Sequence, residues 1–320
     1  MKFLKFLIPI LLVFIGINVA QAANLTVESE KQNYNDEKKL ITLEKKVNVN
    51  IDDINIKSPK AFLTITPNGK PDTATFVEGA RAIQVTPNSK SETKANILKL
   101  SLISKEVEAT GNVESRMEKL GKPTITIKSD YQSFKVDSNL MEVKDNVIMT
   151  YGDIRATSNS AKIWLSKQGG LEYLKLIGNA KITQDKIMVI GDTVDLDAKT
   201  EVMTATGAAY TNVIVDDSTT VKIWANNQQY NNKSNTAVAN GNVKIHYNTY
   251  VATGPKAVMI ADKQTQKPNK IFFSGRSKIK DGDKSIEADK IIITMSPKNF
   301  EADGNVKTKI NNLSGLDSGK

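Results

Sequence analysis

A short motif recurs along most of the chain and limits what the chain can fold into. In residues 239–245 (Ala-Asn-Gly-Asn-Val-Lys-Ile) a small polar segment containing glycine is followed by apolar residues at every second position. Similar segments recur every 29 to 34 residues, and we call their anchor positions the seams: Lys45, Gly79, Gly111, Asp145, Gly178, Gly207, Gly241, Gly275 and Gly304. A period of this length is typical of solenoids, arrays and repeated hairpins.

Each copy of the motif alternates apolar and polar residues. After the seam at Asp145, for example, Val147, Met149 and Tyr151 fall on one face of an extended chain. Successive side chains of a strand point to opposite sides, so this pattern predicts half-buried strands. We therefore predict an all-β fold in which each copy supplies two to four short antiparallel strands, entered through a turn at the seam. Residues 89–102 are the one weak candidate for a helix, and they fit a strand about as well.

The ends of the chain differ from the repeats. Residues 1–23 are predicted to be an export signal peptide, because Lys2 and Lys5 precede an apolar run and residues 20–22 (Ala-Gln-Ala) offer a cleavage site. An uncleaved inner-membrane anchor is the competing interpretation. Residues 24–40 are polar and predicted to be a loose arm, residues 41–310 a single elongated repeat domain, and residues 311–320 a flexible tail.

Charge and composition exclude several classes of protein. The formal net charge is +9, but the lysines are scattered, which favours attraction to anionic glycolipid or phosphate groups over binding to nucleic acid. The chain has no cysteine, which excludes disulfides, a cysteine nucleophile and a lipid-modified N-terminal cysteine.

Residues for catalysis are sparse. His246 is the only histidine, and alternation places it on the polar face of its strand. The pairs Asp216-Asp217 and Asp281-Gly282-Asp283 lack the further ligands of a calcium loop and are predicted to be hairpin turns. We therefore predict no enzymatic activity, no cofactor and no metal site.

Two linked segments carry a resemblance to a known family. The strand at 286–293 (Ile-Glu-Ala-Asp-Lys-Ile-Ile-Ile) leads into the seam segment at 301–306 (Glu-Ala-Asp-Gly-Asn-Val), and the repeated combination resembles the OstA-like (LptA-type) family over residues 41–310. That resemblance implies an open, twisted β-jelly-roll, or β-taco, whose interior holds the acyl chains of lipopolysaccharide or a similar glycolipid. It also implies a periplasmic location, transport to the outer membrane, inner- and outer-membrane transport components as partners, and a head-to-tail homo-oligomer. The chain departs from the family in being long for a single bridge protein.

Alternation selects the residues that would line such an interior. Most positions two and four residues after a seam are apolar, and with selected positions of the neighbouring strands they give the predicted lining: Val47, Val49, Ile83, Val113, Val147, Met149, Ile163, Ile182, Ile223, Val243, Ile245, Ile279, Ile291, Ile293 and Val306. The same residues would also suit a closed, dry core, as in a structural or surface β-solenoid that assembles through its ends, and this alternative stays open.

The sequence pattern also leads to predictions for Arg81, for the two tryptophans and for two strand edges. Arg81 is the charged exception among the inward positions, and either a lipid phosphate at an opening or a shifted register in that copy accounts for it. Trp164 and Trp224 have the opposite parity and suit either a rim or the outer face. The segments 47–56 and 291–310 are predicted to be open strand edges that pair with other chains.

Overall fold

The protein is all-β. The computed structural model describes residues 25–311 except 52, 167–169, 217–218, 263, 265–267 and 296, and these residues contain 22 strands and no helix. The described residues divide into two compact units, 25–177 and 178–311, and strand β13 (Leu171–Gln184) crosses the division. The predicted signal peptide and the predicted tail from residue 312 onwards lie outside the described residues.

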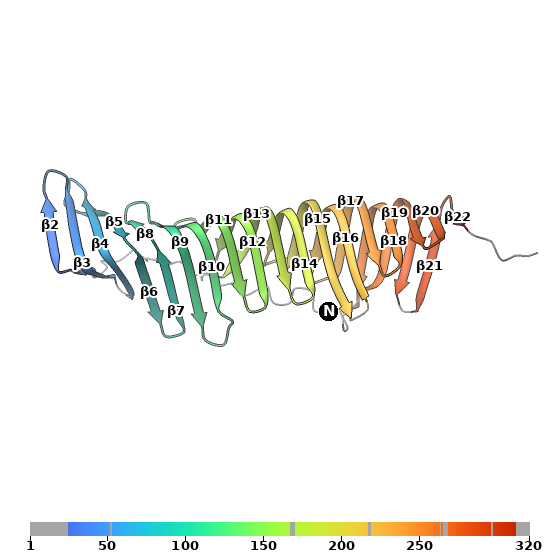
Figure 1. Ribbon diagram of the computed structural model, residues 1–320, viewed down its shortest axis with the longest axis horizontal. Coiled ribbons are helices and arrows are strands. Elements are labelled where there is room, and N and C mark those ends of the chain that lie inside the picture. Colours follow the sequence, from blue (N-terminus) through green and yellow to red (C-terminus); the bar gives the residue numbers. More distant parts are fainter. Residues whose placement is uncertain are drawn as a thin grey trace, which may run out of the picture. The chain divides into compact units, whose positions relative to one another are not determined.

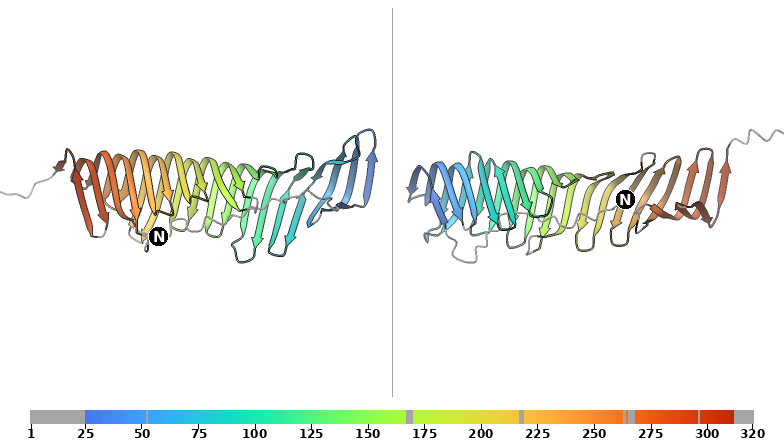
Figure 2. Two further views of the ribbon diagram at one scale, coloured as in Figure 1. Left: turned by 180° about the vertical axis from the view of Figure 1, so that it is seen from behind. Right: turned by 90° about the horizontal axis from the view of Figure 1, so that it is seen from below.

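The strands of each unit follow one another in chain order and pair antiparallel (Figures 1 and 2). The N-terminal unit contains β1 (Leu25–Glu28), β2 (Lys31–Asn35), β3 (Leu40–Ile51), β4 (Ile54–Ile65), β5 (Pro71–Val77), β6 (Ala80–Thr86), β7 (Ser89–Ala95), β8 (Ile97–Ser101), β9 (Glu106–Lys119), β10 (Ile125–Lys135), β11 (Leu140–Tyr151) and β12 (Ile154–Leu165). The C-terminal unit contains β14 (Ile187–Asp197), β15 (Val202–Asp216), β16 (Thr219–Asn231), β17 (Thr236–Tyr247), β18 (Tyr250–Ala261), β19 (Pro268–Asp281), β20 (Lys284–Met295), β21 (Lys298–Asp303) and β22 (Lys307–Ile310).

Seven of the nine seams lie inside strands rather than at their entry, which corrects one expectation, and Gly79 and Gly304 lie between strands. Most copies consist of two long strands, such as β17 and β18 with 12 residues each, and the seam Gly241 falls in the middle of β17. Two strands per copy agrees with the predicted two to four, whereas the predicted entry through a turn was wrong because the seam glycine was interpreted as a turn. Residues 89–102, the weak helix candidate, form strands β7 and β8.

Most seams form a β-bulge. In β17 the residues Gly241 and Asn242 have φ of 75° and 51°, and together they oppose the single residue Pro255 of β18. Two residues against one bend a strand sharply, and a left-handed backbone suits glycine and asparagine. The same arrangement places one bend residue opposite most seams; these bend residues are Pro59, Asp130, Asn159, Asn226, Pro255 and Asp289.

The bends fold the strands of each unit into two facing walls. We call the segments on one side of the seams wall A: 47–51, 54–58, 80–86, 89–95, 113–119, 125–129, 147–151 and 154–158, then 209–215, 219–224, 243–247, 250–254, 277–281 and 284–288. Wall B contains the segments on the other side: 40–44, 60–65, 71–77, 97–101, 106–110, 131–135, 140–144 and 160–165, then 202–206, 227–231, 236–240, 256–261, 268–274 and 290–295.

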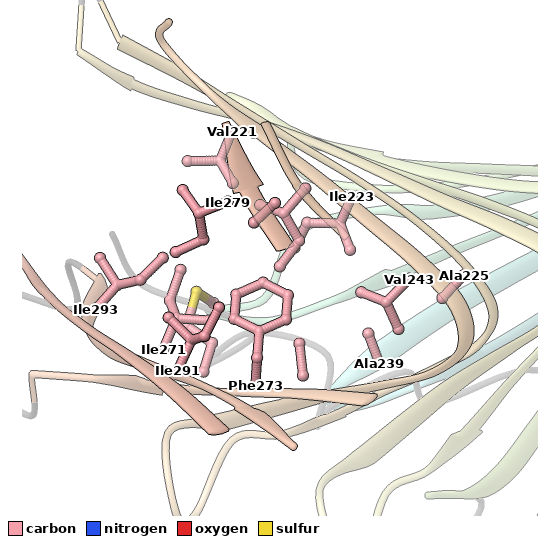
Figure 3. Close-up of a cluster of buried hydrophobic side chains, with 14 of the residues drawn as sticks. Val221, Ile223, Ala225, Ala239, Val243, Ile271, Phe273, Ile279, Ile291 and Ile293 are labelled. Carbon is pink, nitrogen blue, oxygen red and sulfur yellow. The ribbon is translucent and has the colours of Figure 1, made fainter. Parts of the chain in front are cut away.

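The core lies between the walls. In the C-terminal unit, Ile279 of wall A lies across the cluster from Ile271 and Phe273 of wall B (Figure 3). Phe273 is 1% exposed and Ile271 is 2% exposed, so the side chains of the two walls exclude water from each other. Burial of this apolar surface is the main stabilising contribution to such a fold.

The polar N-terminal arm is more regular than its composition suggested. Residues expected to be loose form β1 and β2, and both strands pair with β3, β1 along 48–51 and β2 along 40–44. This overturns the prediction that residues 47–56 are an open edge, because β3 has neighbours on both sides. At the other end β20 is likewise covered, by β21 and β22, so within the described part of the chain the outermost strands are β1 and β2 at one end and β21 and β22 at the other.

Candidate functional site

The predicted lining residues gather in the space between the walls. Thirteen of the fifteen are buried, with exposed fractions between 0 and 7%: Val47, Val49, Val113, Val147, Met149, Ile163, Ile182, Ile223, Val243, Ile245, Ile279, Ile291 and Ile293. Alternation holds across the bulges because the inward positions on either side of a seam stay four residues apart in their own strand, as Val143 and Val147 do around Asp145-Asn146. Met141, Val143, Val147 and Met149, on either side of the seam in β11, all point inward.

Ile83 is half-buried rather than interior, and the seam of its own copy explains why. The left-handed pair there is Glu78 and Gly79, one residue earlier than the Gly111-Asn112 pair of the next copy. The displaced bulge turns Ala80 and Ala82 inward, with exposed fractions of 3% and 0%. The register shift considered for Arg81 is therefore confirmed.

Arg81 consequently lies on the outer face. Its Nε donates a hydrogen bond of 2.7 Å to Oε1 of Glu92, and Lys94 lies 3.1 Å from the same oxygen. The Arg81 hydrogen bond is the largest of the effects that lower the pKa of Glu92. The position is a surface ion pair and not a charge inside the groove.

Val306 is 52% exposed and does not line the interior. It precedes β22, whose four residues are all exposed and pair only with β20 within the described residues. An inward position needs a following repeat to cover it, and the last copy has none in the described part of the chain.

An apolar pocket lies inside the N-terminal unit. Both walls contribute to it, with Val49 from wall A and Leu43 from wall B. Every residue that lines it is apolar: Val27, Leu43, Val49, Ile51, Ala61, Phe62, Leu63, Ala74, Phe76, Leu100 and Leu102. A space with no polar group suits hydrocarbon and offers nothing to orient a polar ligand.

A second pocket lies at the rim of wall B in the C-terminal unit. Its inner part is formed by Tyr230, Ala237, Met259 and Ala261. Its rim carries the polar residues Asn231, Asn232, Asn235 and Thr236. The pocket therefore combines an apolar base with a polar entrance.

Polar side chains cross the interior at two places that the sequence pattern did not single out. Thr211 Oγ1 of wall A donates a hydrogen bond of 2.7 Å to Gln228 Oε1 of wall B, and Ser115 Oγ makes the same bond, also 2.7 Å, to Gln132 Oε1. All four side chains are buried. The sequence pattern places Ser115 and Thr211 at inward positions as polar residues, but it does not predict that each of them bonds to a glutamine.

Carboxylates and lysines pair across neighbouring strands of the outer faces. Lys99 Nζ donates to Glu108 at 2.8 Å, Lys162 lies 3.0 Å from Glu142, and Lys278 donates to Glu287 at 2.8 Å. The hydrogen bond from the lysine is in each case the main cause that lowers the pKa of the carboxyl group. Exposed pairs of this kind contribute little to stability and keep the outer face hydrated.

The tryptophans lie on the outer side of wall strands, as their parity predicted. Trp164 packs edge-on against Tyr173, with ring centroids 5.3 Å apart. Trp224 contacts Tyr210 at 5.1 Å and His246 at 5.0 Å, and Lys244 Nζ lies 5.7 Å from its ring centroid. These contacts follow strand pairing and leave both tryptophans half-buried.

His246 is half-buried against Trp224 rather than freely exposed. Its Nε2 is buried and has no hydrogen-bond partner. Loss of hydration is the main cause that lowers the pKa of the imidazole, and Lys244 and Lys222 lower it further. A lone imidazole with two lysines nearby lacks the acid, the nucleophile and the second ligand that a catalytic or metal site requires.

No group of three or more histidine, aspartate or glutamate residues that could hold a metal ion occurs in the part of the chain that the structure describes. Asp281 and Asp283 lie at the turn between β19 and β20, as expected, and the Asp216-Asp217 pair falls at the edge of the described residues. A search of residues 25–311, apart from the gaps, finds no helix long and apolar enough to cross a membrane.

Comparisons with known proteins give one similarity worth stating. No protein-family model matches the chain, and no curated protein matches it. Among solved structures it is similar to LptH of Pseudomonas aeruginosa, described as the LptA homologous periplasmic component of the conserved lipopolysaccharide transport device. The two share 13% identity over 35% of this chain and 76% of that chain, with a TM-score of 0.30. A similarity of this size decides neither fold nor function, so both depend on the features of the chain itself.

Proposed function

We propose that this protein is a non-enzymatic carrier that shields the acyl chains of lipopolysaccharide, or of a similar glycolipid, between its two walls on the way to the outer membrane. The observation that carries the proposal is the wholly apolar pocket between the walls of the N-terminal unit. The repeat motif that resembles the OstA-like family supports it, as does the scatter of positive charge over the chain. A periplasmic location, with transport components at both membranes as partners, belongs to the same proposal.

The energetics of hydrocarbon burial suit this role. Each methylene removed from water contributes about 0.8 kcal/mol, so a tail of about ten buried methylenes contributes about 8 kcal/mol without any polar contact. The Asn-lined rim of the second pocket would leave a sugar or phosphate group in water while the tail lies deeper. The lining of the rest of the interior is packed, so the walls must part for more tail to enter.

That packing also favours a second candidate, a structural β-solenoid with a dry core. The thirteen buried lining residues fill the space between the walls themselves. In this alternative the apolar residues only stabilise the fold, and the outermost strands serve assembly.

Photo-crosslinking separates the two candidates. A photo-reactive amino acid is placed at Leu63, which lines the apolar pocket, or at Ile245, which is 4% exposed, and the protein is mixed with purified lipopolysaccharide. The matched outward controls are Lys57 on the strand of Leu63 and Lys244 beside Ile245, both exposed. Lipid adducts at the inward positions alone support the carrier. Adducts at neither inward position, or equal adducts at inward and outward positions, favour the structural protein.

A further inference from the structure

A hydrogen-bonded bridge crosses the interior of the C-terminal unit. Thr211 lies on β15 in wall A, and Gln228 and Tyr230 lie on β16 in wall B, at 0%, 2% and 5% exposure. The Thr211 hydroxyl donates to Gln228 Oε1 at 2.7 Å, and the single proton of the Tyr230 hydroxyl goes to either Gln228 Oε1 or Thr211 Oγ1, both of which lie against it. The Gln228 amide donates to the carbonyls of Ala209 and Ile223, at 2.8 and 3.1 Å. We call this cluster the C-terminal tie.

A matching bridge crosses the N-terminal unit. Ser115 on wall A donates to Gln132 Oε1 on wall B at 2.7 Å, and Thr93 extends the cluster, with its hydroxyl 3.1 Å from that of Ser115. The Gln132 amide donates to the carbonyl of Ile127 at 3.2 Å. In both ties the hydroxyl residue precedes its glutamine by 17 residues, and the glutamine donates to a carbonyl five residues before it. We call this cluster the N-terminal tie.

The ties replace apolar pairs found at the same place in other copies. Ser115 and Thr211 stand four residues after a seam, and Gln132 and Gln228 stand two residues after a bend residue. In four of the copies without a tie both positions are apolar and buried: Val49 with Ala61, Met149 with Ala161, Ile245 with Ala257 and Ile279 with Ile291. Both members therefore change together, which points to a specific bridge rather than to scattered polar substitutions.

Each tie stands beside an apolar pocket. Tyr230 of the C-terminal tie is itself part of the lining of the pocket that continues to Ala237 and Met259. In the N-terminal unit the pocket extends to Leu100 on β8, which pairs with Val107 of β9, and Gln132 of the tie pairs with Ala109 of the same β9 segment. A hydrocarbon tail that passed a tie would separate hydrogen-bonded groups and leave them buried without partners, which is unfavourable.

We infer that the two ties are end stops that divide the interior into compartments and so set the length of tail each compartment accepts. This inference depends on the proposed carrier function and sharpens it. Lipid tails enter and leave each compartment sideways, through the gap between the rims of the two walls. They do not pass lengthwise along the interior beyond Gln132 or Gln228.

The test measures how the affinity for saturated fatty acids depends on their length, by displacement of a fluorescent fatty acid from the full mature chain. The variants replace each tie with apolar residues of similar shape: Thr211→Val with Gln228→Leu and Tyr230→Phe, and separately Ser115→Ala with Gln132→Leu. Thr211→Val alone and Ser115→Ala alone are the milder versions if a multiple variant does not fold. Thr193→Val is the control, because it removes a hydroxyl contact of 2.6 Å to Thr206 that involves only half-buried residues outside both ties.

The expected results differ between the intact protein and the variants. In the intact chain affinity rises about fourfold for each added methylene and then levels off, whereas in the tie variants the rise continues to longer tails. The control follows the intact chain. If the intact chain binds fatty acids and every tie variant levels off at the same length, the inference is overturned while the carrier function stands. If the intact chain binds no fatty acid of any length, the proposed function and this inference fall together.

Discussion

Replacement of the seam glycine Gly241 by alanine tests why the strands bend where they do. Gly241 has φ of 75°, and a Cβ built on it would lie 2.5 Å from Asn226 Nδ2, 2.9 Å from Cγ and 3.0 Å from Cβ. Rotation of the Asn226 side chain can move Nδ2 away but cannot move its Cβ. We therefore expect two costs at this position, one from the left-handed backbone and one from overpacking against the neighbouring strand.

The destabilisation caused by the left-handed backbone and that caused by overpacking can be separated by comparing glycines that differ in their surroundings. A left-handed conformation costs a non-glycine residue about 1–2 kcal/mol, and forced overpacking adds about 1–3 kcal/mol. Gly69 has the same φ of 75° with no atom within 4 Å of a built Cβ, and Gly282, at φ of 55° in the same unit as Gly241, is equally open. We expect Gly241→Ala to cost about 2–5 kcal/mol, and Gly69→Ala and Gly282→Ala only the backbone term.

Urea unfolding followed by the fluorescence of Trp224 provides the measurement, in a Trp164→Phe background so that only the C-terminal unit reports. Asn226→Gly is the rescue partner for Gly241→Ala, because it removes the atoms that the new methyl group meets. The explanation fails if Gly241→Ala and Gly282→Ala destabilise equally, or if Asn226→Gly does not reduce the effect of Gly241→Ala. Lys45 and Asp145 already occupy seams with φ of 63° and 61°, so the backbone term alone is tolerated by this fold.

Three further predictions concern the core, the histidine and the N-terminal strands. Phe273→Ala should lower the free energy of unfolding by about 3–5 kcal/mol in the same urea assay, since the ring is 1% exposed, and Phe272→Ala on the outer side should cost less than half as much. Burial lowers the pKa of His246 in the folded state, so the unfolded chain binds the proton more readily, and the free energy of unfolding should fall as the pH drops through about 6.5. His246→Gln should remove this dependence of stability on pH. An unchanged pH dependence in the variant would contradict the assignment of the effect to His246. A chain lacking residues 25–35 uncovers the β3 edge and should self-associate with rising concentration in light scattering, while a monomer at all concentrations would show that β1 and β2 do not protect it.

The sequence predicted the all-β class and which residues are buried at nearly all of the inward positions, because alternation and repeat period are local properties of the chain. Val243 and Ile245 could be assigned inward from their distance to the seam alone. The bend itself could not be predicted, because a glycine followed by asparagine favours a tight turn and a bulge equally, and only pairing with Pro255 on the next strand decides between them.

Contacts between distant residues explain the remaining differences. The polar composition of residues 24–40 predicted a loose arm, yet backbone pairing with β3 orders β2 although all five of its residues are exposed. Gln132 and Gln228 gave no signal as single residues, because each matters only through a hydroxyl on the opposite wall. Val306 was assigned from its own copy, and its exposure depends on the copy that would follow.

The ties also bear on how a chain of near-identical hairpins folds correctly. Because the strands of different copies carry the same bulge, a strand can pair with the equivalent strand of the wrong copy. The seams of two such mispaired strands lie opposite each other just as those of native pairs do. Gln132 finds its hydroxyl partner only when β9 and β10 are in their own copy, and Gln228 only when β15 and β16 are. A pairing displaced by one copy would leave a buried glutamine against Met149 or Ile245 and be penalised for it. The two polar pairs thus distinguish their own repeats from the other, similar repeats, and they favour native strand pairing over pairing displaced by one copy.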